Sequence, residues 1–386
     1  MIRNITVGID IGTRTTRVVV VGHIKNSPSL KVLGIGSAPS KGLRHGYIIN
    51  KKDTLKGVVA AVKAAENSSG IKIKNAFLSI GGISLESSIT RGVVVISRVD
   101  REITEIDTEK AIELSKEGLH NLSNKKVIYT IPLHFKIDGK EVLGKPQGMK
   151  GEKLEVKTLF VTCLEQHVED LISTVERAGV EVEDVVAAPI AAGLVALTKK
   201  QRTVGCLLAN IGAETVSISV FEDDILVSLQ VFPIGSTDIT NDIALGLQIP
   251  LDEAEKLKVD GESKLYSKRK LDEIIEARLS DIFELIESHL KKIKRSGLLP
   301  GGIIITGGGA GISTIEDLAK ATLKLPSKKA SPDVFKNSTG QIENSSWFVA
   351  YGLCVYGFQQ LRMNKSSVAI GAIRKRVVSW IKQLLP

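Results

Sequence analysis

Two short segments, separated by two hundred residues, have the residue types and spacing best suited to binding phosphate. Each has the pattern of a strand, a tight glycine turn and a second strand, with Asp10 and Gly12 in the first and Asn210 and Gly212 in the second. Because glycine lacks a Cβ, each turn can bring successive backbone N–H groups close to a phosphate. Two related lobes, each offering one hairpin, would clamp a nucleotide, and Asp10 could hold Mg²⁺ through its waters. Hydroxyl donors follow at Thr13, Thr15 and Thr215.

A third glycine-rich segment supports the idea of a nucleotide cleft. The apolar run 303–305 leads into a run of glycines, and a helical pattern follows over 315–323. A strand, a glycine turn and a helix make a site where backbone can lie flat against an adenosine. Glu255 and Lys258 are three residues apart, so they lie on one helical face and could also reach an adenosine. A solvated ion pair is the alternative interpretation of these two residues.

The bulk composition limits the possible partners. The chain has 386 residues, of which 43% are hydrophobic and 25% charged, and this indicates a globular protein with two domains or one bilobal body. Its formal charge of +9 favours nucleic acid, an anionic membrane or an acidic partner. Only 4% of the residues are aromatic and no nucleic-acid motif is present, so we expect no nucleic acid partner.

The sequence predicts a cytoplasmic location. No signal peptide precedes the first expected strand, and no apolar run approaches the roughly 20 residues that a membrane-spanning helix needs. Cys163, Cys206 and Cys354 are far apart and lack metal-ligand spacing. We therefore expect them to be reduced residues of the core.

The three glycine segments together resemble a known superfamily. Asp10-Ile11-Gly12-Thr13, Asn210-Ile211-Gly212 and Thr306-Gly307-Gly308-Gly309 are similar to the first phosphate, second phosphate and adenosine motifs of the actin superfamily. Within that superfamily the chain resembles the FtsA family over nearly its whole length. Further signals of that family are Gly34-Ile35-Gly36, Gly42-Leu43-Arg44-His45-Gly46, Ile80-Gly81-Gly82, Ile131-Pro132 and Ala254-Glu255-Lys256-Leu257-Lys258.

The resemblance implies an α/β fold of the actin-like, ribonuclease H-like type, with two lobes, a nucleotide cleft and an inserted α+β subdomain. The first lobe, subdomain 1A, would comprise 1–80, 163–203 and about 346–358, and the inserted subdomain 1C would span 81–162. The second lobe would span 204–345, with subdomain 2B at about 243–298. A linker at 359–371 and an amphipathic helix at 372–386 would complete the chain.

The resemblance also implies a site for ATP and Mg²⁺, in which Asp10 holds the metal through water. Arg17 could supply a phosphate contact, although a solvent-facing strand residue is an equal alternative. The family assigns no residue here that we can name as catalytic. The residues that match the family's nucleotide-binding positions are Asp10, Gly12, Thr13, Arg14, Thr15, Arg17, Asn210, Gly212, Ala213, Glu214, Thr215, Gly235, Glu255, Lys258, Gly307, Gly308, Gly309 and Ala310.

Two departures from the superfamily pattern predict very slow hydrolysis at most. Asn210 stands where the superfamily usually has an acidic residue, and an amide adds no charge that would activate a water. The segment 187–193 has no ionisable or amide side chain, although hydrolytic relatives tend to place a water-orienting residue near it. General acid–base help of that kind is worth about 100-fold or more.

The FtsA resemblance implies a filament-forming protein that ties the division ring to the membrane. The chain would anchor the ring of the tubulin-like FtsZ on the cytoplasmic face of the membrane at the division site, as a peripheral protein, and help to recruit other division proteins. Subdomain 1C would carry the filament contact and would bind those other proteins. The C-terminal tail of FtsZ would dock on a basic surface, for which a solvated helix face is the alternative. The residues that motivate it are Lys264, Lys268, Arg269, Lys270, Lys291, Lys292, Lys294 and Arg295.

Two other members of the superfamily are alternatives. A PilM-like protein of type IV pilus assembly also carries the inserted subdomain, and a terminal membrane helix favours FtsA over it. A sugar-kinase-like phosphotransferase would need a catalytic carboxylate in the cleft, for which the sequence offers no candidate.

The last residues have the pattern of an amphipathic helix that lies in a membrane surface. At about 100° per residue, the apolar side chains span an arc of about 160°, with Trp380 suited to the interface. Basic side chains on the other side would contact anionic lipid, each contributing about 1 kcal/mol. Packing of this helix on the body of the protein is the alternative. The residues concerned are Ile373, Arg374, Lys375, Arg376, Val377, Trp380, Ile381, Lys382, Leu384 and Leu385.

Overall fold

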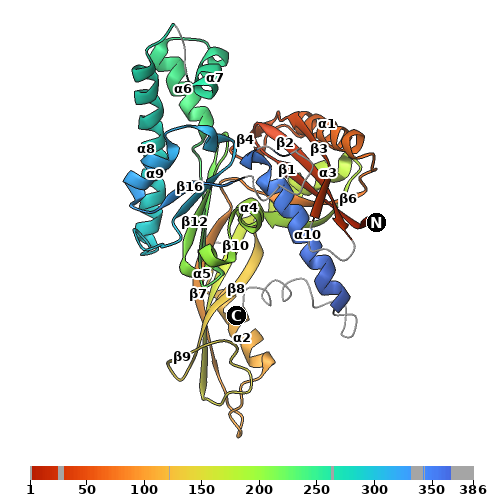
Figure 1. The fold of residues 1–386 in the computed structure, drawn as a ribbon. Coiled ribbons are helices and arrows are strands. Elements are labelled where there is room, and N and C mark those ends of the chain that lie inside the picture. The colour runs from red at the N-terminus through yellow and green to blue at the C-terminus, as the bar shows by residue number, and fades with distance from the viewer. Residues whose placement is uncertain are drawn as a thin grey trace.

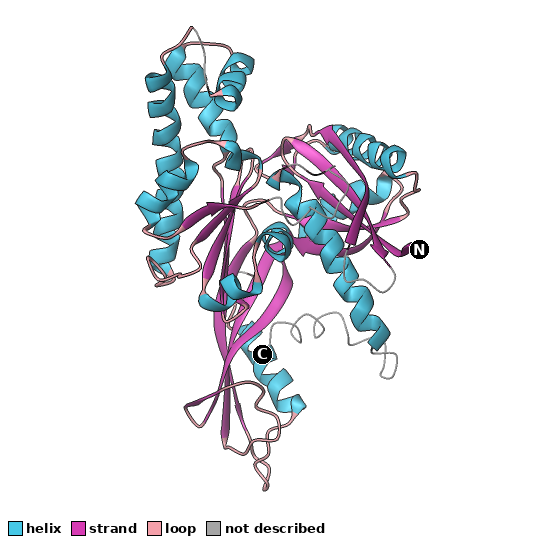
Figure 2. Cartoon of the chain, in the orientation of Figure 1, coloured by secondary structure: helices cyan, strands magenta, loops and turns pink. Residues whose placement is uncertain are grey.

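Three larger sheets and one two-stranded sheet occur in the described part of the chain. The structure, a computed structural model, describes residues 2–24, 30–120, 122–261, 265–331, 342 and 344–366. Two five-stranded sheets with helices packed on them form two lobes, and a four-stranded sheet projects away from both (Figure 1). Figure 2 shows that long strands form most of this projection and that helix lies alongside them.

The two five-stranded sheets share one topology. Their strand orders are β11-β6-β1-β2-β3 and β14-β13-β12-β15-β16. In each, three antiparallel strands in sequence are followed by two strands that run parallel to the first. The internal similarity at an offset of two hundred residues is therefore a repeat of the whole lobe. The strands are β1 Ile2–Ile11, β2 Thr15–Ile24, β3 Leu30–Pro39, β6 Asn75–Ile80 and β11 Glu181–Ala187, then β12 Cys206–Ile211, β13 Val216–Glu222, β14 Ile225–Phe232, β15 Ile303–Thr306 and β16 Ser327–Lys329.

Helices pack closely on the first-lobe sheet. Helix α10 lies against β1 and β2, and a Cβ at Gly8 of β1 would be only 2.1 Å from the carbonyl oxygen of Ala350. Only glycine permits this approach. Helix α4 packs between α10 and the second-lobe sheet. The elements of this lobe and its border are the hairpin β4 Leu43–Arg44 and β5 Tyr47–Ile48, α1 Lys51–Ser69, α3 Glu165–Arg177, α4 Ala188–Ala196, α5 Lys199–Val204, η3 Ser345–Trp347 and α10 Phe348–Ser366.

The second-lobe sheet is buried on both faces. Along β12, Leu207 and Ala209 join the core that contains the residues of α8 and α9, whereas Cys206 and Leu208 join the core around α4. Successive side chains of a strand point to opposite faces, so this alternation requires an almost wholly apolar strand. The helical elements here are α6 Ser236–Leu247, α7 Leu251–Asp260, α8 Lys268–Lys292, η1 Gly308–Gly311 and α9 Ile315–Leu323.

The inserted subdomain has its own sheet and core. Its strand order is β7-β10-β8-β9, and α2 packs on β7 and β10. Val94, Ala111 and Leu154 are among the buried residues of this small core. Near the lobes, the Ser87 hydroxyl bonds to both the backbone N–H and the carbonyl of Leu229 in β14. The elements are β7 Glu86–Val95, α2 Glu105–Glu117, β8 Lys125–Ile137, β9 Lys140–Val142 and β10 Lys153–Leu164.

Helix α10 is longer than the sequence indicated. Helix α10 continues to Ser366, so the first half of the expected linker 359–371 is helical; no glycine or proline interrupts 359–366. Helix α6 begins at Ser236, a few residues before the expected start of subdomain 2B at about 243. The expected membrane helix at 372–386 lies outside the described residues. Within the described ranges, no helix has the length and apolar character needed to cross a membrane.

Candidate nucleotide-binding site

A cleft of about 370 Å³ lies where the two lobes meet, and both predicted hairpins contribute to its wall. The cleft therefore gathers segments that are two hundred residues apart in the chain. The predicted residues that line it are Asp10, Gly12, Thr13, Arg14, Thr15, Arg17, Asn210, Gly212, Ala213, Thr215, Glu255, Lys258, Gly307 and Gly308.

The two hairpin turns have matching geometry. A Cβ at Gly12 would lie 2.9 Å from the carbonyl oxygen of Thr15, and one at Gly212 would lie 2.9 Å from that of Thr215. A real Cβ does not approach an oxygen so closely, so both turns require glycine. In the second turn the Gly212 N–H donates to the Thr215 carbonyl at 2.8 Å. Each lobe thus presents a tight turn of backbone with a threonine hydroxyl beside it.

Asp10 is a half-buried carboxylate near the end of β1. Its Oδ1 accepts a hydrogen bond of 2.7 Å from the Ser79 hydroxyl, and in the β1–β2 register Asp10 pairs with Arg17. Burial raises the pKa of Asp10, while the Ser79 bond and the Arg17 charge oppose that rise. Burial likewise lowers the pKa of Arg17, whose guanidinium carbon lies 5.6 Å from the ring centre of Trp347. Arg17 thus lines the cleft, at the side where the carboxylate lies.

A polar network on α6 and α7 holds Glu255 and Lys258. The Lys258 ammonium donates to Glu255 Oε2 at 2.8 Å, to the Thr240 hydroxyl at 2.7 Å and to the Ser236 carbonyl at 2.9 Å. Burial lowers the pKa of Lys258, whereas for Glu255 the bonds from Lys258 and Thr240 outweigh burial and lower its pKa. Arg14, from the first-lobe turn, reaches across to Glu255 Oε1 at 2.7 Å. Glu255 and Lys258 are therefore part of the cleft wall, and residues of both lobes bond to this pair.

The glycine run after β15 combines one packed and one open position. Gly307 has a φ of 94°, and a Cβ there would lie 2.4 Å from the Asn210 amide oxygen. In contrast, a Cβ at Gly308 would meet nothing within 4 Å. Gly308 therefore faces open space in the cleft, where a flat ring system could lie against the backbone.

Four predicted residues lie outside the cleft wall. Glu214 instead accepts a hydrogen bond from the His45 backbone N–H at 2.6 Å, and its own carbonyl lies 3.1 Å from His45 Nδ1. Gly235 packs on the turn, since a Cβ there would lie 2.3 Å from the Ala213 carbonyl oxygen. Gly309 and Ala310 are both buried, and Gly309 packs against Ile211.

Several lining residues were absent from the sequence prediction. Ser79 precedes the Ile80-Gly81-Gly82 motif by one residue, so that motif was the one local signal for it. Ile11, Gly46, Gly81 and Gly82 stand in glycine motifs noted above, but no role in the site was predicted for them. The others lie in strands and helices that have no glycine signature. Those that line the cleft are Ile11, Gly46, Ser79, Gly81, Gly82, Leu171, Ala188, Ser217, Val231, Ser236, Val259, Ser346 and Val349.

The cleft has few groups that could activate a water. Among the described lining residues the carboxylates are Asp10 and Glu255, and both are engaged by other side chains. Only Ala188 of the segment 187–193 reaches the wall. No group of three or more His, Cys, Asp or Glu side chains that could hold a metal directly occurs in the described part of the chain.

Comparison with known proteins identifies the family. A family model described as "Cell division protein FtsA" matches residues 207–352, and another, "SHS2 domain inserted in FTSA", matches residues 82–162. The cell division protein FtsA of Borreliella burgdorferi is 30% identical over 97% of this chain and 96% of its own length. That of Bacillus subtilis is 31% identical over 85% of this chain and 78% of its own length. The chain belongs to the FtsA family of cell division proteins.

Solved structures agree on the fold. The PilM-PilN type IV pilus biogenesis complex matches with a TM-score of 0.67 and 16% identity, covering 91% of this FtsA family member and 98% of the other chain. MreB 5 of Spiroplasma citri bound to AMPPNP matches with a TM-score of 0.57 and 13% identity, covering 95% of this chain and 99% of the MreB 5 chain. At these identities the likeness shows the actin-like fold alone. The family and the fold class predicted from the sequence are both confirmed.

Proposed function

We propose that the cleft binds ATP with Mg²⁺ and turns it over very slowly. One observation carries the proposal: two turns of matching geometry, Gly12 and Gly212, face a single cleft together with the open Gly308. Turns of this kind direct backbone N–H groups at phosphate oxygens, and the adjoining hydroxyls add donors. In MreB 5 of Spiroplasma citri, a protein of the same fold, the solved structure holds AMPPNP.

The residues present fit this ligand. The cleft volume of about 370 Å³ lies in the range of small-molecule sites. Arg17 and Lys258 supply positive charge to the wall. Asp10 uses one oxygen for Ser79 and can accept hydrogen bonds from magnesium-bound waters with the other, as Mg²⁺ usually keeps several waters. The bound metal would neutralise phosphate charge. Slow turnover follows because the segment 187–193 has no carboxylate that could orient or activate a water.

Calorimetry with Mg-ATP tests the cleft. The wild type should bind, and Gly308→Arg should abolish binding because the new side chain fills the open space. Gly311→Arg is the matched control, because Gly311 does not line the cleft and a Cβ at this position would meet nothing within 4 Å. Asn210→Asp should raise hydrolysis. Absence of wild-type binding would reject the nucleotide proposal, whereas rapid turnover would reject only its slow hydrolysis.

We further propose that the chain anchors the FtsZ ring to the cytoplasmic face of the membrane at the division site. Membership of the FtsA family supports this role, and the amphipathic pattern of 373–385 supplies an anchor for anionic lipid. A chain ending at Ser366, where α10 ends, should no longer sediment with anionic vesicles. The control is a full-length chain with Arg374, Lys375, Arg376 and Lys382 changed to Ser, which should bind weakly and lose its salt dependence. Full sedimentation of the shortened chain would reject the anchor.

The basic surface that we propose for the FtsZ tail divides into two parts, one at the start of α8 and one at and just beyond its end. This helix has 25 residues, so the clusters at 268–270 and 291–295 are about 35 Å apart. At the first, Arg269 is paired with Glu273 at 2.9 Å. An extended acidic tail could span both clusters, and charge reversal at Arg269 or Lys292 should each weaken it. Unchanged affinity in fluorescence anisotropy for both variants would reject this surface.

Self-association into filaments, with subdomain 1C at the contact, completes the proposed function. The match of residues 82–162 to the SHS2 domain inserted in FtsA supports the presence of that subdomain. A chain lacking these residues should keep Mg-ATP binding and lose filaments on an anionic lipid monolayer. Wild-type filaments from the shortened chain, seen by electron microscopy, would contradict the assignment of the contact.

A further inference from the structure

The outer strand of the inserted subdomain, β7, has an open edge. It is the first strand of the sheet, and it pairs only with β10 among the described strands, without a bulge. The first residues of β7 lie against β14, where Ser87 bonds to Leu229. Beyond that contact the strand continues away from the second lobe to Val95.

The outward backbone groups of β7 can be assigned from one hydrogen bond. The Ile96 N–H donates to the Glu152 carbonyl, on the β10 side, at 2.7 Å. In an antiparallel pair the bonding direction alternates along the strand, and the β7–β10 register is unbroken. Gly92 and Val94 therefore bond toward β10. Ile89, Arg91, Val93 and Val95 direct their N–H and C=O groups outward.

The same four residues expose their side chains. Ile89, Val93 and Val95 are 42%, 41% and 72% exposed, while Val94 between them is buried under α2 at 5%. Natural edge strands are usually protected by lysine, proline, a bulge or a covering element. Here the edge from 89 to 95 has one charged residue, Arg91, and no such cover within the described part of the chain. An apolar, unprotected edge of this kind is typical of a strand-addition site.

Positive charge surrounds the exposed face. Opposite Arg91 in the register lies Lys157, and opposite Val95 lies Lys153. Lys136 of β8 adds a further cation next to Glu155. Glu155 is already paired with Lys153 at 2.7 Å. The charge at this part of the face therefore suits an acidic partner.

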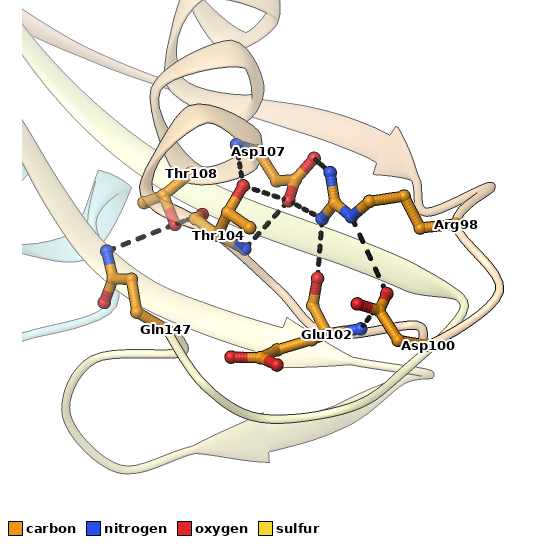
Figure 3. Close-up of polar contacts among 7 residues, drawn as sticks. All are labelled: Arg98, Asp100, Glu102, Thr104, Asp107, Thr108 and Gln147. Atoms are coloured by element: carbon orange, nitrogen blue, oxygen red, sulfur yellow. Dashed lines mark hydrogen bonds and ion pairs between the residues drawn. The ribbon is translucent and has the colours of Figure 1, made fainter.

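The loop that follows β7 is fixed by side-chain hydrogen bonds (Figure 3). The Asp107 carboxylate accepts bonds from the Thr104 backbone N–H at 2.8 Å, from the Thr104 hydroxyl at 2.7 Å and from Arg98. Arg98 also donates to the Glu102 carbonyl at 2.5 Å. A held loop keeps the end of the strand in place, so a partner would lose less entropy in binding to it.

We propose that the open edge of β7, residues 89–95, binds an extended peptide segment that alternates apolar and acidic side chains, as an added strand of the sheet. The outward backbone groups would form the main-chain hydrogen bonds with the peptide. The side chains of Val93 and Val95 would make the apolar contacts. Arg91 and the neighbouring lysines would favour acidic side chains in the peptide. This inference rests on the proposed function only in giving subdomain 1C a recruiting role. It is independent of nucleotide.

A fluorescein-labelled peptide in which valine alternates with threonine and aspartate tests the edge. It should bind the full chain about tenfold more tightly than a version with lysine in place of aspartate. Val93→Pro should lower affinity at least about tenfold, because proline removes an outward N–H that β10 does not use. Val93→Thr keeps the N–H and the β-branched shape, and should bind almost as the wild type. Arg91→Glu should reverse the preference between the two peptides.

Hydrogen exchange on the wild type provides a test that needs no variant. The amides of Ile89, Arg91, Val93 and Val95 should exchange rapidly in the free chain and slowly with the acidic peptide. Unprotected amides, or equal binding to a folded Val93→Pro chain, would overturn the proposal. If the protection of these amides from exchange rises with protein concentration in the absence of peptide, the edge binds a second copy of the chain, and the peptide proposal is overturned. Neither result changes the Mg-ATP titration or membrane sedimentation, so the proposed function is judged separately.

Discussion

At the scale of single residues, the cleft depends on an acid that burial makes hard to ionise. Asp10 is half-buried in the cleft wall, and the Ser79 hydroxyl and the Arg17 charge favour its ionised form. Both decide how much negative charge Asp10 can present to a metal-bound water, which makes them positioning residues for the proposed site.

This leads to a prediction on pH. Because the pKa of Asp10 is raised, the group gains its proton at a higher pH than an ordinary aspartate, and Mg-ATP affinity should fall as the pH is lowered toward that raised value. In Ser79→Ala a bond to the ionised form is lost, so the fall should begin at higher pH. Calorimetry at a series of pH values measures this. Ser346→Ala is the control, since Ser346 lines the cleft without a described bond to Asp10. Equal pH dependence in all three proteins would contradict the prediction.

A second residue-scale prediction concerns Asp107. Burial opposes its charge, but bonds from Arg98 and Thr104 outweigh burial and lower its pKa to about 2. The folded pKa is below the usual 3.8, so this stabilisation is complete above that value and is lost as the pH falls toward 2. Asp107→Asn should therefore destabilise the start of α2 by about 1–3 kcal/mol at neutral pH. Hydrogen exchange of α2 measures this. Asp100→Asn, whose carboxylate is largely exposed, should change exchange little.

At the scale of elements, α10 is held by close backbone approach on two sides. Gly8 of β1 meets the Ala350 carbonyl on one side, and Gly352 of α10 itself meets the Ala191 carbonyl of α4 on another. A Cβ at Gly352 would lie 1.9 Å from that oxygen. Small residues thus set the distance between the first-lobe sheet, α10 and α4.

Enlarging this contact should be costly. Gly352→Ala should lower the free energy of unfolding by about 1–3 kcal/mol, because either α10 or α4 must shift. Gly311→Ala is the matched control: a Cβ there meets nothing within 4 Å, so its effect should be small or slightly stabilising. Urea denaturation of the two variants gives the comparison. If the two variants unfold at the same urea concentration, the close approach of Gly352 to Ala191 does not contribute to the free energy of unfolding.

At the scale of the whole molecule, the lobes are joined beside the cleft by contacts that include two bridges from the hairpin turns. Arg14 of the first turn contacts Glu255 of α7, and His45 of the β4–β5 hairpin contacts Glu214 of the second turn. Each bridge starts from a residue of a phosphate turn. Closure of the lobes and the shape of the turns are therefore linked.

Breaking one bridge should speed nucleotide release. Arg14→Ala should raise the dissociation rate of a fluorescent ATP analogue up to about fivefold, since a partly exposed ion pair contributes about 0.2–1 kcal/mol. Arg269→Ala removes an ion pair of similar length from the exposed start of α8 and should leave the rate unchanged. A stopped-flow chase with unlabelled ATP measures both. An unchanged rate in Arg14→Ala would show that the bridge does not limit opening.

The sequence predicted what is encoded over short distances. The turns at Gly12 and Gly212 and the pair Glu255–Lys258 have local patterns, and the structure brings them to one cleft. The bridge from Arg14 to Glu255 could not be predicted, because it joins residues that share no local pattern and meet only after the lobes pack. The open edge of β7 could not be predicted for the same reason, because the order of all the strands in a sheet determines which strand lies at its edge.

Helix α10 begins beside the cleft, where Trp347 precedes it and Val349 lines the wall, and it ends at Ser366. Its 19 residues make a rod about 28 Å long. A rod pivoting at one end multiplies displacement with distance from the pivot. A tilt of about 5° at the cleft would therefore carry Ser366 through about 2 Å. A change in the tilt of α10 at the proposed nucleotide site would therefore be enlarged at the point where the chain leaves this helix.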